Sequence, residues 1–177
     1  MISGGNVTAP GFSYLDYIDT STEPEKQGIL GQVHWFDVGG FLVPHKLVQV
    51  HTACNGDVVA AGNVLYWAGD NVVTNLLSSA LSSSVNHYAG IAPQVTASVP
   101  ESTSTIIYWM WMQIGGRATV TTNGDDDIAI GDLIIASATT AVCDSAASPT
   151  FGNFIGVAAA ADNDSANTVA VNLAYKG

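Results

Sequence analysis

Ile106-Ile107-Tyr108-Trp109-Met110-Trp111-Met112 is the strongest strand signal in this chain of 177 residues. Short apolar runs rich in Val, Ile, Trp and Tyr and bounded by Gly, Asn, Asp or Pro are typical of β-strands. This run is too long and too apolar for a strand with one wet face, so we predict a strand covered on both faces. Similar runs occur from Gln32 onward, and helical spacing occurs only near Asn71–Val85, where five serines weaken it. The sequence therefore predicts an all-β fold.

Two copies of one pattern lie around this run. Each begins with a strand and an Asn-Gly-Asp turn and continues through a small apolar stretch to a Gly-Asn or Gly-Asp step, with Gly62 matching Gly131. Two further matches follow in the same order, so that the offset falls from 69 to 66 and then to 63 residues. The matched segments are Val50–Leu65 with Ala118–Ile134, Tyr88–Ala92 with Phe154–Ala158, and Thr105–Tyr108 with Thr168–Val171.

The shared pieces have a physical basis. Asn-Gly between apolar runs is a strong hairpin signal, and a Gly inside a short strand lets another backbone come close. We therefore predict two tandem related small β modules of barrel or sandwich type, residues 33–113 and residues 114–177, preceded by an extended N-terminal arm, residues 1–32. Since a unit below about 70 residues is marginal alone, the modules should share a core or lean on other chains.

The arm contains apolar side chains that need burial, namely Phe12, Tyr14, Leu15, Tyr17 and Ile18. Its glycines and prolines interrupt any helical or strand period. The arm packs either on its own domain or on a neighbouring chain, and the sequence leaves both open. Ordering costs about 1–2 kcal/mol per residue in backbone entropy, more than these side chains repay, so we expect only part of the arm to be ordered in the free protein.

The charge balance excludes several classes of partner. Fifteen acids against four bases give a net charge of −11, and the bases are scattered, so we expect no binding to nucleic acid or to an anionic membrane surface. Charged residues make up only 11% of the chain, too few for the outer faces of a coiled coil. The N-terminus lacks the features of a signal peptide, and no run of about 18 apolar residues is present.

The sequence shows no recognisable catalytic or metal-binding pattern, and we predict no enzymatic activity, no cofactor and no metal. His34, His45, His51 and His87 stand outside any nucleophile or zinc signature and are expected to be strand or turn residues. Cys54 and Cys143 lack metal spacing; free thiols are favoured, and a bridge between them stays open. The acidic runs 125–127 and 162–164 are expected to be polar hairpin tips, with calcium binding as the alternative.

The second module resembles the small β module of the head decoration (cement) proteins of tailed bacteriophages. The resemblance covers about 60 residues and rests on four segments: Met112–Val120, Ile128–Leu133, Phe154–Ala158 and the terminal strand Val169–Leu173. It implies a structural virion protein without enzymatic activity. Such a protein is made in the host cytoplasm, sits on the outer surface of the capsid, often as a trimer, and binds the major capsid protein.

The low charge and the aromatic content agree with that role, because the cores of protein interfaces favour Trp, Tyr, Phe and Met. We predict a homo-oligomer, with a trimer favoured, and a partner interface formed by Phe12, Tyr14, Tyr17, Ile18, Trp35 and Phe36. Two alternatives remain: a phage tail or fibre protein that binds a receptor, and a carbohydrate-binding β module. The latter would use Trp35, Trp67, Trp109 or Trp111 as sugar platforms, with Trp109 and Trp111 on one strand face.

Overall fold

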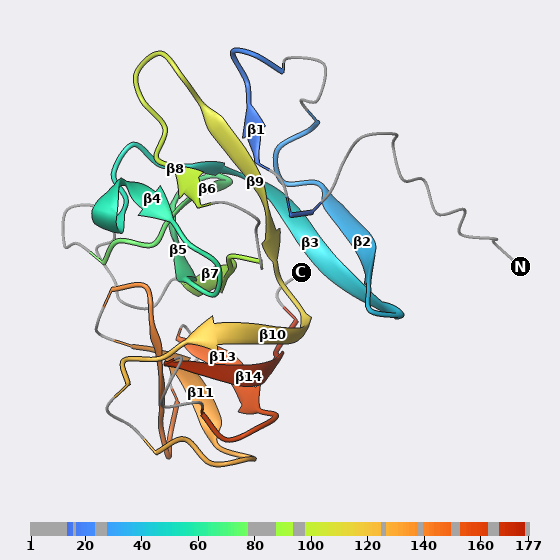
Figure 1. The fold of residues 1–177 in the computed structure, drawn as a ribbon, viewed down its shortest axis with the longest axis vertical. Helices are drawn as coiled ribbons and strands as arrows, with labels where there is room; N and C mark the ends of the chain where they lie inside the picture. Colours follow the sequence, from blue (N-terminus) through green and yellow to red (C-terminus); the bar gives the residue numbers. More distant parts are fainter. Residues whose placement is uncertain are drawn as a thin grey trace, which may run out of the picture.

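The computed structural model describes residues 14–15, 17–23, 28–77, 88–93, 98–124, 127–137, 140–149, 153–162 and 167–175. Over these residues the chain is all-β, and its only helical element is the 3₁₀ turn η2 (Asn55–Asp57) (Figure 1). No helix in this part of the chain is long and apolar enough to cross a membrane. The predicted all-β fold of two related modules is confirmed.

Five strands of the first module form a closed barrel, in the order β3 (Phe41–Val50), β9 (Tyr108–Gln113), β7 (Tyr88–Ile91), β5 (Val64–Gly69) and β6 (Val72–Thr74). All neighbours are antiparallel except β6 and β3, which close the barrel in parallel through the pair Val50 and Val73. Outside the barrel, β1 (Ile18–Asp19) pairs with β9 and β2 (Val33–Val38) pairs with β3. A small separate sheet joins β4 (Val58–Val59) to β8 (Val99–Pro100).

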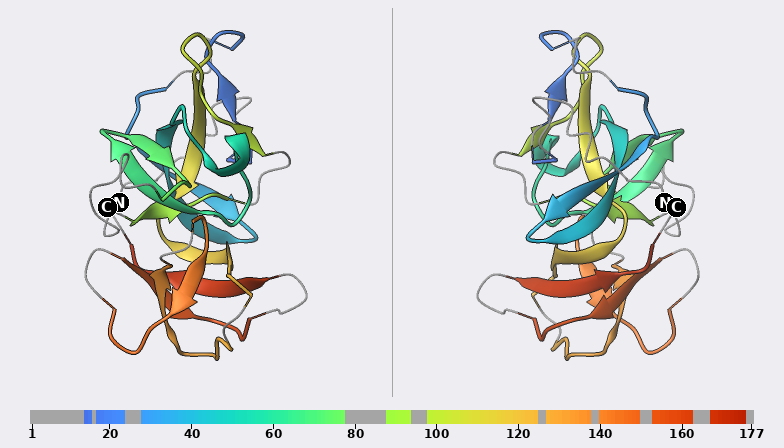
Figure 2. Two further views of the ribbon diagram at one scale, coloured as in Figure 1. Left: turned by 90° about the vertical axis from the view of Figure 1, so that its left-hand side faces the viewer. Right: turned by 90° about the vertical axis from the view of Figure 1, so that its right-hand side faces the viewer.

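The second module is a five-stranded antiparallel sheet that repeats this strand order. It runs β10 (Gly116–Thr121), β14 (Thr168–Leu173), β13 (Phe154–Ala158), β11 (Leu133–Ala136) and β12 (Cys143–Ser145). An isolated parallel bridge between Thr122 and Cys143 connects the ends of the two outer strands, as the pair Val50 and Val73 does in the barrel. Figures 1 and 2 show the two modules stacked along the long axis of the molecule.

The duplication extends to individual hydrogen bonds around Gly62 and Gly131. Both glycines have positive φ, 79° and 93°, in a turn closed by the following Asn63 or Asp132, whose side chain accepts the backbone N–H three residues back, at 2.9 and 2.8 Å. Both glycines donate to the carbonyl of the last residue of the matched segment, Ala92 or Ala158, at 3.0 Å. The predicted equivalence of these two turns is confirmed.

The third predicted match, Thr105–Tyr108 with Thr168–Val171, correctly relates β9 to β14 but places them in the wrong register. Gln113 of β9 lies opposite Ile91 of β7, and Asn172 of β14 lies opposite Val157 of β13. The offset at this strand is therefore 59, and Thr105–Ile107 precede β9 instead of matching β14. Short runs of alternating apolar residues carry too little information to set a register, which depends on the partner strand.

The two Asn-Gly-Asp turns also occupy different positions. Because Val50 and Thr122 are equivalent by their parallel partners, Asn123 directly follows the strand end, whereas Asn55 lies five residues beyond it. Within the segment predicted to have helical spacing, Val72–Thr74 form strand β6; residues 78–85 lie outside the described part of the chain. Val72–Thr74 are held in the strand conformation by pairing with β5 on one side and β3 on the other.

The modules share one hydrophobic core, as predicted. Val64 and Tyr66 of β5 and Tyr88 and Ile91 of β7 are buried among the interior residues of the second module. Residues 62–64, at the start of β5, also make two hydrogen bonds to the second module. The Gly62 carbonyl accepts from Thr121 N–H at 2.9 Å, and Val64 N–H donates to the Ala141 carbonyl at 3.0 Å. The second module therefore depends on the first for part of its core.

The strand first identified in the sequence is buried on both faces, as predicted. Met110 and Met112 lie in the barrel core, and Trp111 lies on the opposite face against Leu47, Ile18 and Phe36. The described part of the arm packs on its own module: Tyr14 contacts the rings of Phe36 and His45, and Tyr17 contacts Tyr108 edge-on at 5.5 Å. Of the two arrangements left open, these residues adopt the intramolecular one.

Candidate interaction surface

A β-hairpin extends from the first barrel and carries four exposed large apolar side chains: Val33, Trp35, Phe41 and Leu42. Strand β3 pairs with β9 only from His45 onward, and the Pro44 carbonyl accepts the Ile114 N–H just beyond β9, so Phe41–Val43 pair with β2 alone (Figure 1). The hairpin turns at Gly39 and Gly40, whose φ values of 63° and 87° suit the tight two-residue turn that matches strand twist. Asp37 accepts the Gly40 N–H at 2.8 Å, which holds the tip.

We call the following five exposed residues the hairpin surface. Phe41 is 75% exposed and Leu42 is 63% exposed beside the tip, and Trp35 is 49% exposed along β2. Tyr175 stacks on Trp35 with ring centroids 6.2 Å apart, and Val33 completes the set. Among the described residues only Ile29 and Ile130 are other large apolar side chains of comparable exposure. Exposed apolar side chains gathered in one place mark sites of interaction.

The outer edge of β2 is also open. Strand β2 is the last strand of its sheet in the described part of the chain, where no other strand pairs with its outward backbone groups. Native proteins protect such edges with Lys, Pro or bulges, but β2 carries one charged residue, Asp37, and neither Lys nor Pro. The hairpin therefore combines an apolar surface with an unprotected edge.

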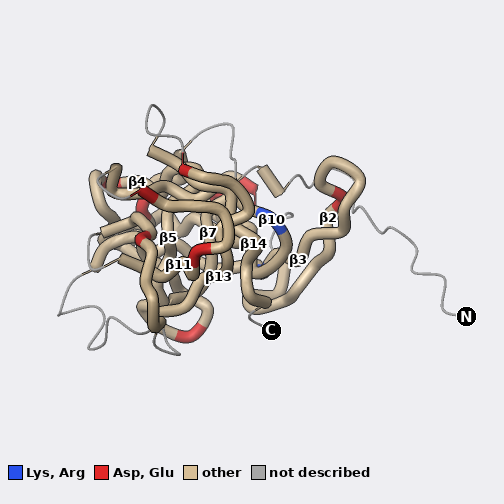
Figure 3. Tube along the Cα trace, turned by 90° about the horizontal axis from the view of Figure 1, so that it is seen from below, with Lys and Arg blue, Asp and Glu red and all other residues tan. Residues whose placement is uncertain are grey.

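Charge is sparse around the hairpin. In the described part of the chain, Figure 3 shows acidic residues at several places and basic residues in one region near β10. The described cations are Lys46, whose ammonium lies 5.2 Å from the centre of the Trp67 ring, and Arg117 in β10. The hairpin surface therefore offers a partner mainly apolar contacts and few charged ones.

The six residues predicted to form a partner interface fall into different environments. Ile18 and Phe36 are buried in the aromatic cluster with Leu47 and Trp111, so in this chain they stabilise the fold. Tyr14 and Tyr17 are half-buried against the same module, and Phe12 lies outside the described residues. Trp35 is the member of the set that is open to a partner.

Sequence reasoning missed Phe41 and Leu42, the most exposed residues of the hairpin surface. The signal was present: an apolar pair directly follows a Gly-Gly turn, where a hairpin tip is expected to be polar. Trp109 and Trp111 lie on the same face of their strand, as predicted, but that face packs against the aromatic cluster. Because Trp111 is buried there, these two residues cannot form the predicted sugar platform.

The aromatic cluster encloses one buried histidine. His45 is 1% exposed, its Nδ1 lies 3.0 Å from the Val43 carbonyl oxygen, and its Nε2 has no hydrogen-bond partner. The rings of Tyr14 and Phe36 pack against it at 5.1 and 5.3 Å. Burial lowers the pKa of His45 from 6.5 to about 4, and the nearby His34 contributes in the same direction.

This burial makes stability pH-dependent. The unfolded chain binds the His45 proton near pH 6.5 and the folded chain only near pH 4, so stability falls as the pH drops through this interval. Between pH 7 and pH 5 we expect a loss of about 2 kcal/mol in the free energy of unfolding from this residue. Urea unfolding of the wild type and of His45→Phe at both pH values measures it. Parallel pH dependences for the two proteins would contradict the assignment.

Both cysteines are free and buried, Cys54 in the first barrel and Cys143 in the shared core. Burial raises the pKa of both thiols, that of Cys143 to about 12, which keeps them protonated and weakly reactive. Among the described residues no three His, Cys, Asp or Glu side chains are grouped to hold a metal ion. Parts of both acidic runs, residues 125–126 and 163–164, lie outside that description.

Comparison with protein-family models, with curated proteins and with solved structures finds no match to this chain. The geometry of the hairpin surface is therefore the structural basis for a proposal about function.

Proposed function

We propose that this chain is a structural virion protein of a tailed phage, a decoration or cement protein without enzymatic activity. It binds the outer surface of the head and stabilises contacts between major capsid subunits. The all-β duplicated fold and the segments of the second module that resemble the decoration family support this role. In this proposal the protein is a homo-oligomer, with a trimer favoured, and is made in the host cytoplasm.

The observation that carries the proposal is the hairpin surface. A rigid barrel presents Phe41 and Leu42 on opposite faces of a two-stranded extension, and Trp35, stacked on Tyr175, lies on the same face as Leu42. Full burial of a side chain of this size contributes roughly 1.5–3 kcal/mol. A few such residues, repeated over the subunits of an oligomer, give firm attachment to a capsid without charge complementarity.

The proposal is tested on heads of the encoding phage assembled without this protein. Phe41→Ser with Leu42→Ser should weaken attachment at least about a hundredfold, because two apolar contacts of at least about 1.5 kcal/mol each are lost. The matched control is Ile130→Ser, since Ile130 is 73% exposed but lies in the second module. Binding is measured by co-sedimentation with the heads.

Copy number separates the capsid role from the main alternative. Hundreds of copies on each purified particle are expected for a decoration protein, whereas a handful indicates a tail or fibre protein that binds a receptor. A carbohydrate-binding module is the other alternative, since the exposed Trp35 stacked on Tyr175 offers an aromatic platform. Saturable quenching of tryptophan fluorescence by oligosaccharides, lost in Trp35→Ala, would replace the capsid proposal with that one.

A further inference from the structure

The backbone groups of β2 alternate between those that bind β3 and those that face outward. Opposite residues of an antiparallel pair either exchange backbone hydrogen bonds or point these groups away from each other, and the two kinds of pair alternate along the strands. The Leu47 N–H donates to the Gln32 carbonyl at 3.0 Å, so residues 34, 36 and 38 also bind β3. Pro44, which has no N–H, lies opposite Trp35, as this alternation requires.

Val33, Trp35 and Asp37 consequently direct their backbone N–H and carbonyl groups away from β3. Figure 1 shows β2 on the outside of its sheet, with β3 between it and the barrel. In the described part of the chain, no strand or loop residue bonds these outward groups. They form a row of donors and acceptors that repeats about every 7 Å, which an extended chain can pair with.

The side chains beside this edge suit an apolar strand. Val33, Trp35 and Asp37 project from one face of the hairpin, where Trp35 is 49% exposed and stacks on Tyr175. A strand paired with β2 places one of its side chains directly opposite Trp35, about 5 Å away at the Cβ atoms. Aromatic and β-branched residues stabilise a sheet most in this position. The edge therefore favours a partner with an apolar side chain there.

Charge narrows the choice of partner strand. Asp37 is the only charged residue of β2, and the whole chain carries a net charge of −11. An acidic segment is repelled by both, whereas an uncharged or weakly basic segment is not. A second copy of this chain fits this edge poorly for the same reason, because it brings the same negative charge and its β2 has no Lys or Arg to face Asp37. The charges thus favour a strand of a different protein.

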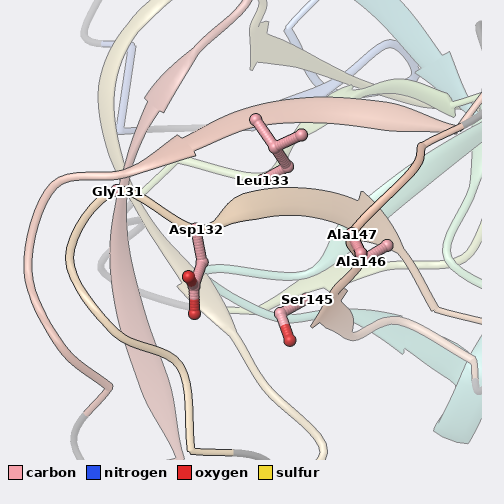
Figure 4. Close-up of a pocket in the computed structure, with 6 residues that line it drawn as sticks. All are labelled: Gly131, Asp132, Leu133, Ser145, Ala146 and Ala147. Carbon is pink, nitrogen blue, oxygen red and sulfur yellow. The ribbon is translucent and has the colours of Figure 1, made fainter.

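A pocket of about 290 Å³ in the second module offers a protein partner less than this edge does. Figure 4 shows the Asp132 carboxylate and the Ser145 hydroxyl on the same side of two strands. The Asp132 carboxylate already accepts the Ala129 N–H at 2.8 Å, and the lining residues include no aromatic side chain. The lining consists of Gly131, Asp132, Leu133, Ser145, Ala146 and Ala147.

We propose that the outer edge of β2 pairs with an extended, mainly apolar and non-acidic segment of the major capsid protein, which adds a strand to the sheet of the first module. This inference rests on the proposed function and specifies how the hairpin attaches. Backbone hydrogen bonds to β2 supply affinity, and the fit of alternate side chains beside Trp35 supplies specificity. Phe41 and Leu42 belong to β3, so both stay available for further contacts with the head.

Two substitutions of Trp35 test the backbone pairing. Trp35→Pro removes the outward N–H and keeps the pairing with β3, as Pro44 does on the opposite strand, whereas Trp35→Ala loses the same ring and keeps the N–H. Binding to heads assembled without this protein is measured by co-sedimentation. We expect Trp35→Pro to bind at least about tenfold more weakly than Trp35→Ala, because it loses a hydrogen bond and its ring obstructs the incoming strand. Equal affinities would overturn the inference.

Hydrogen exchange of the wild-type protein gives a second measurement that needs no substitution. In the free protein the amides of Trp35 and Asp37 should exchange rapidly, whereas that of Phe36, which faces β3, is protected. On the heads, exchange at Trp35 and Asp37 should slow at least about tenfold, with Phe36 unchanged. Unchanged exchange at Trp35 and Asp37 would contradict the pairing. Protection of these two amides in the concentrated protein without heads would assign the edge to a second copy and also contradict it.

These outcomes separate the inference from the proposed function. If Trp35→Pro and Trp35→Ala bind equally while the Phe41→Ser, Leu42→Ser variant binds weakly, the head is held by the faces of the hairpin and the edge pairing is wrong. If the wild-type chain does not bind heads at all, both the capsid role and the edge pairing are wrong.

Discussion

Replacing Gly156 with alanine is expected to destabilise the protein by roughly 3 kcal/mol or more, because among the described glycines an added Cβ would approach backbone atoms most closely here. A Cβ at this position would lie 2.1 Å from the Asn172 carbonyl oxygen and 3.0 Å from the Leu173 Cα. These are backbone atoms of the paired strand β14, so no side chain can move aside and the strands must separate. Overpacking of this kind ordinarily costs about 1–3 kcal/mol, and rigid neighbours raise that cost.

Two other glycines make this experiment specific. Gly90 is the equivalent position in the first module, where a Cβ would lie 2.6 Å from the Gln113 carbonyl oxygen, so Gly90→Ala should also destabilise strongly. Gly69 ends strand β5 with nothing closer than 3.7 Å, so Gly69→Ala should be nearly neutral. Thermal unfolding measures all three. Equal melting temperatures for Gly156→Ala and Gly69→Ala would contradict the close approach of β13 and β14.

Replacing Tyr66 with alanine is expected to cost about 3–5 kcal/mol, because it opens a large cavity in the core that the modules share. Tyr66 is 1% exposed and belongs to the first barrel, yet its ring packs among side chains of the second module. A loss of this size lowers the melting temperature by at least about 6 °C in a chain of this length. Both modules should melt in one calorimetric transition in the wild type and in the variant.

Tyr66→Phe is the matched control. It removes only the hydroxyl, whose contact with the Ser137 carbonyl is long, at 3.4 Å, so we expect a change within about 1 kcal/mol. Two separate transitions in the wild type, with Tyr66→Ala shifting only one of them, would show that the modules fold independently and that the shared core contributes little.

Local chemistry explains which features were predictable from the residues alone. The Gly-Asn and Gly-Asp turns at Gly62 and Gly131 close on themselves through a glycine with positive φ and a neighbouring side chain, so they recur wherever those residues do. The strand at Trp109–Met112 was evident because few other structures bury so apolar a run. All-β character and duplication follow from such short-range signals.

Features that depend on distant pairing were not predictable in the same way. The register of β9 is set by β3 and β7, and a shift of four residues leaves its apolar pattern nearly unchanged. Burial is decided by neighbours as well: Phe36 lies under Tyr14 and beside Trp111, whereas the adjacent Trp35 faces outward. Successive residues of a strand point to opposite faces, and composition does not say which face is covered.

The differences between the two modules also separate features set by local sequence from features set by the tertiary structure. Both copies carry the residues of the turn and the close-packed glycine strand, and these can be read from the chain. Asn75 of the first module is buried and hydrogen-bonded to Asn55 and Val58, whereas Ser145, two residues after Cys143, lines an open pocket in the second module. Turn residues act through bonds to their immediate neighbours, whereas a pocket forms only once strands that are distant in the sequence have been assembled around it.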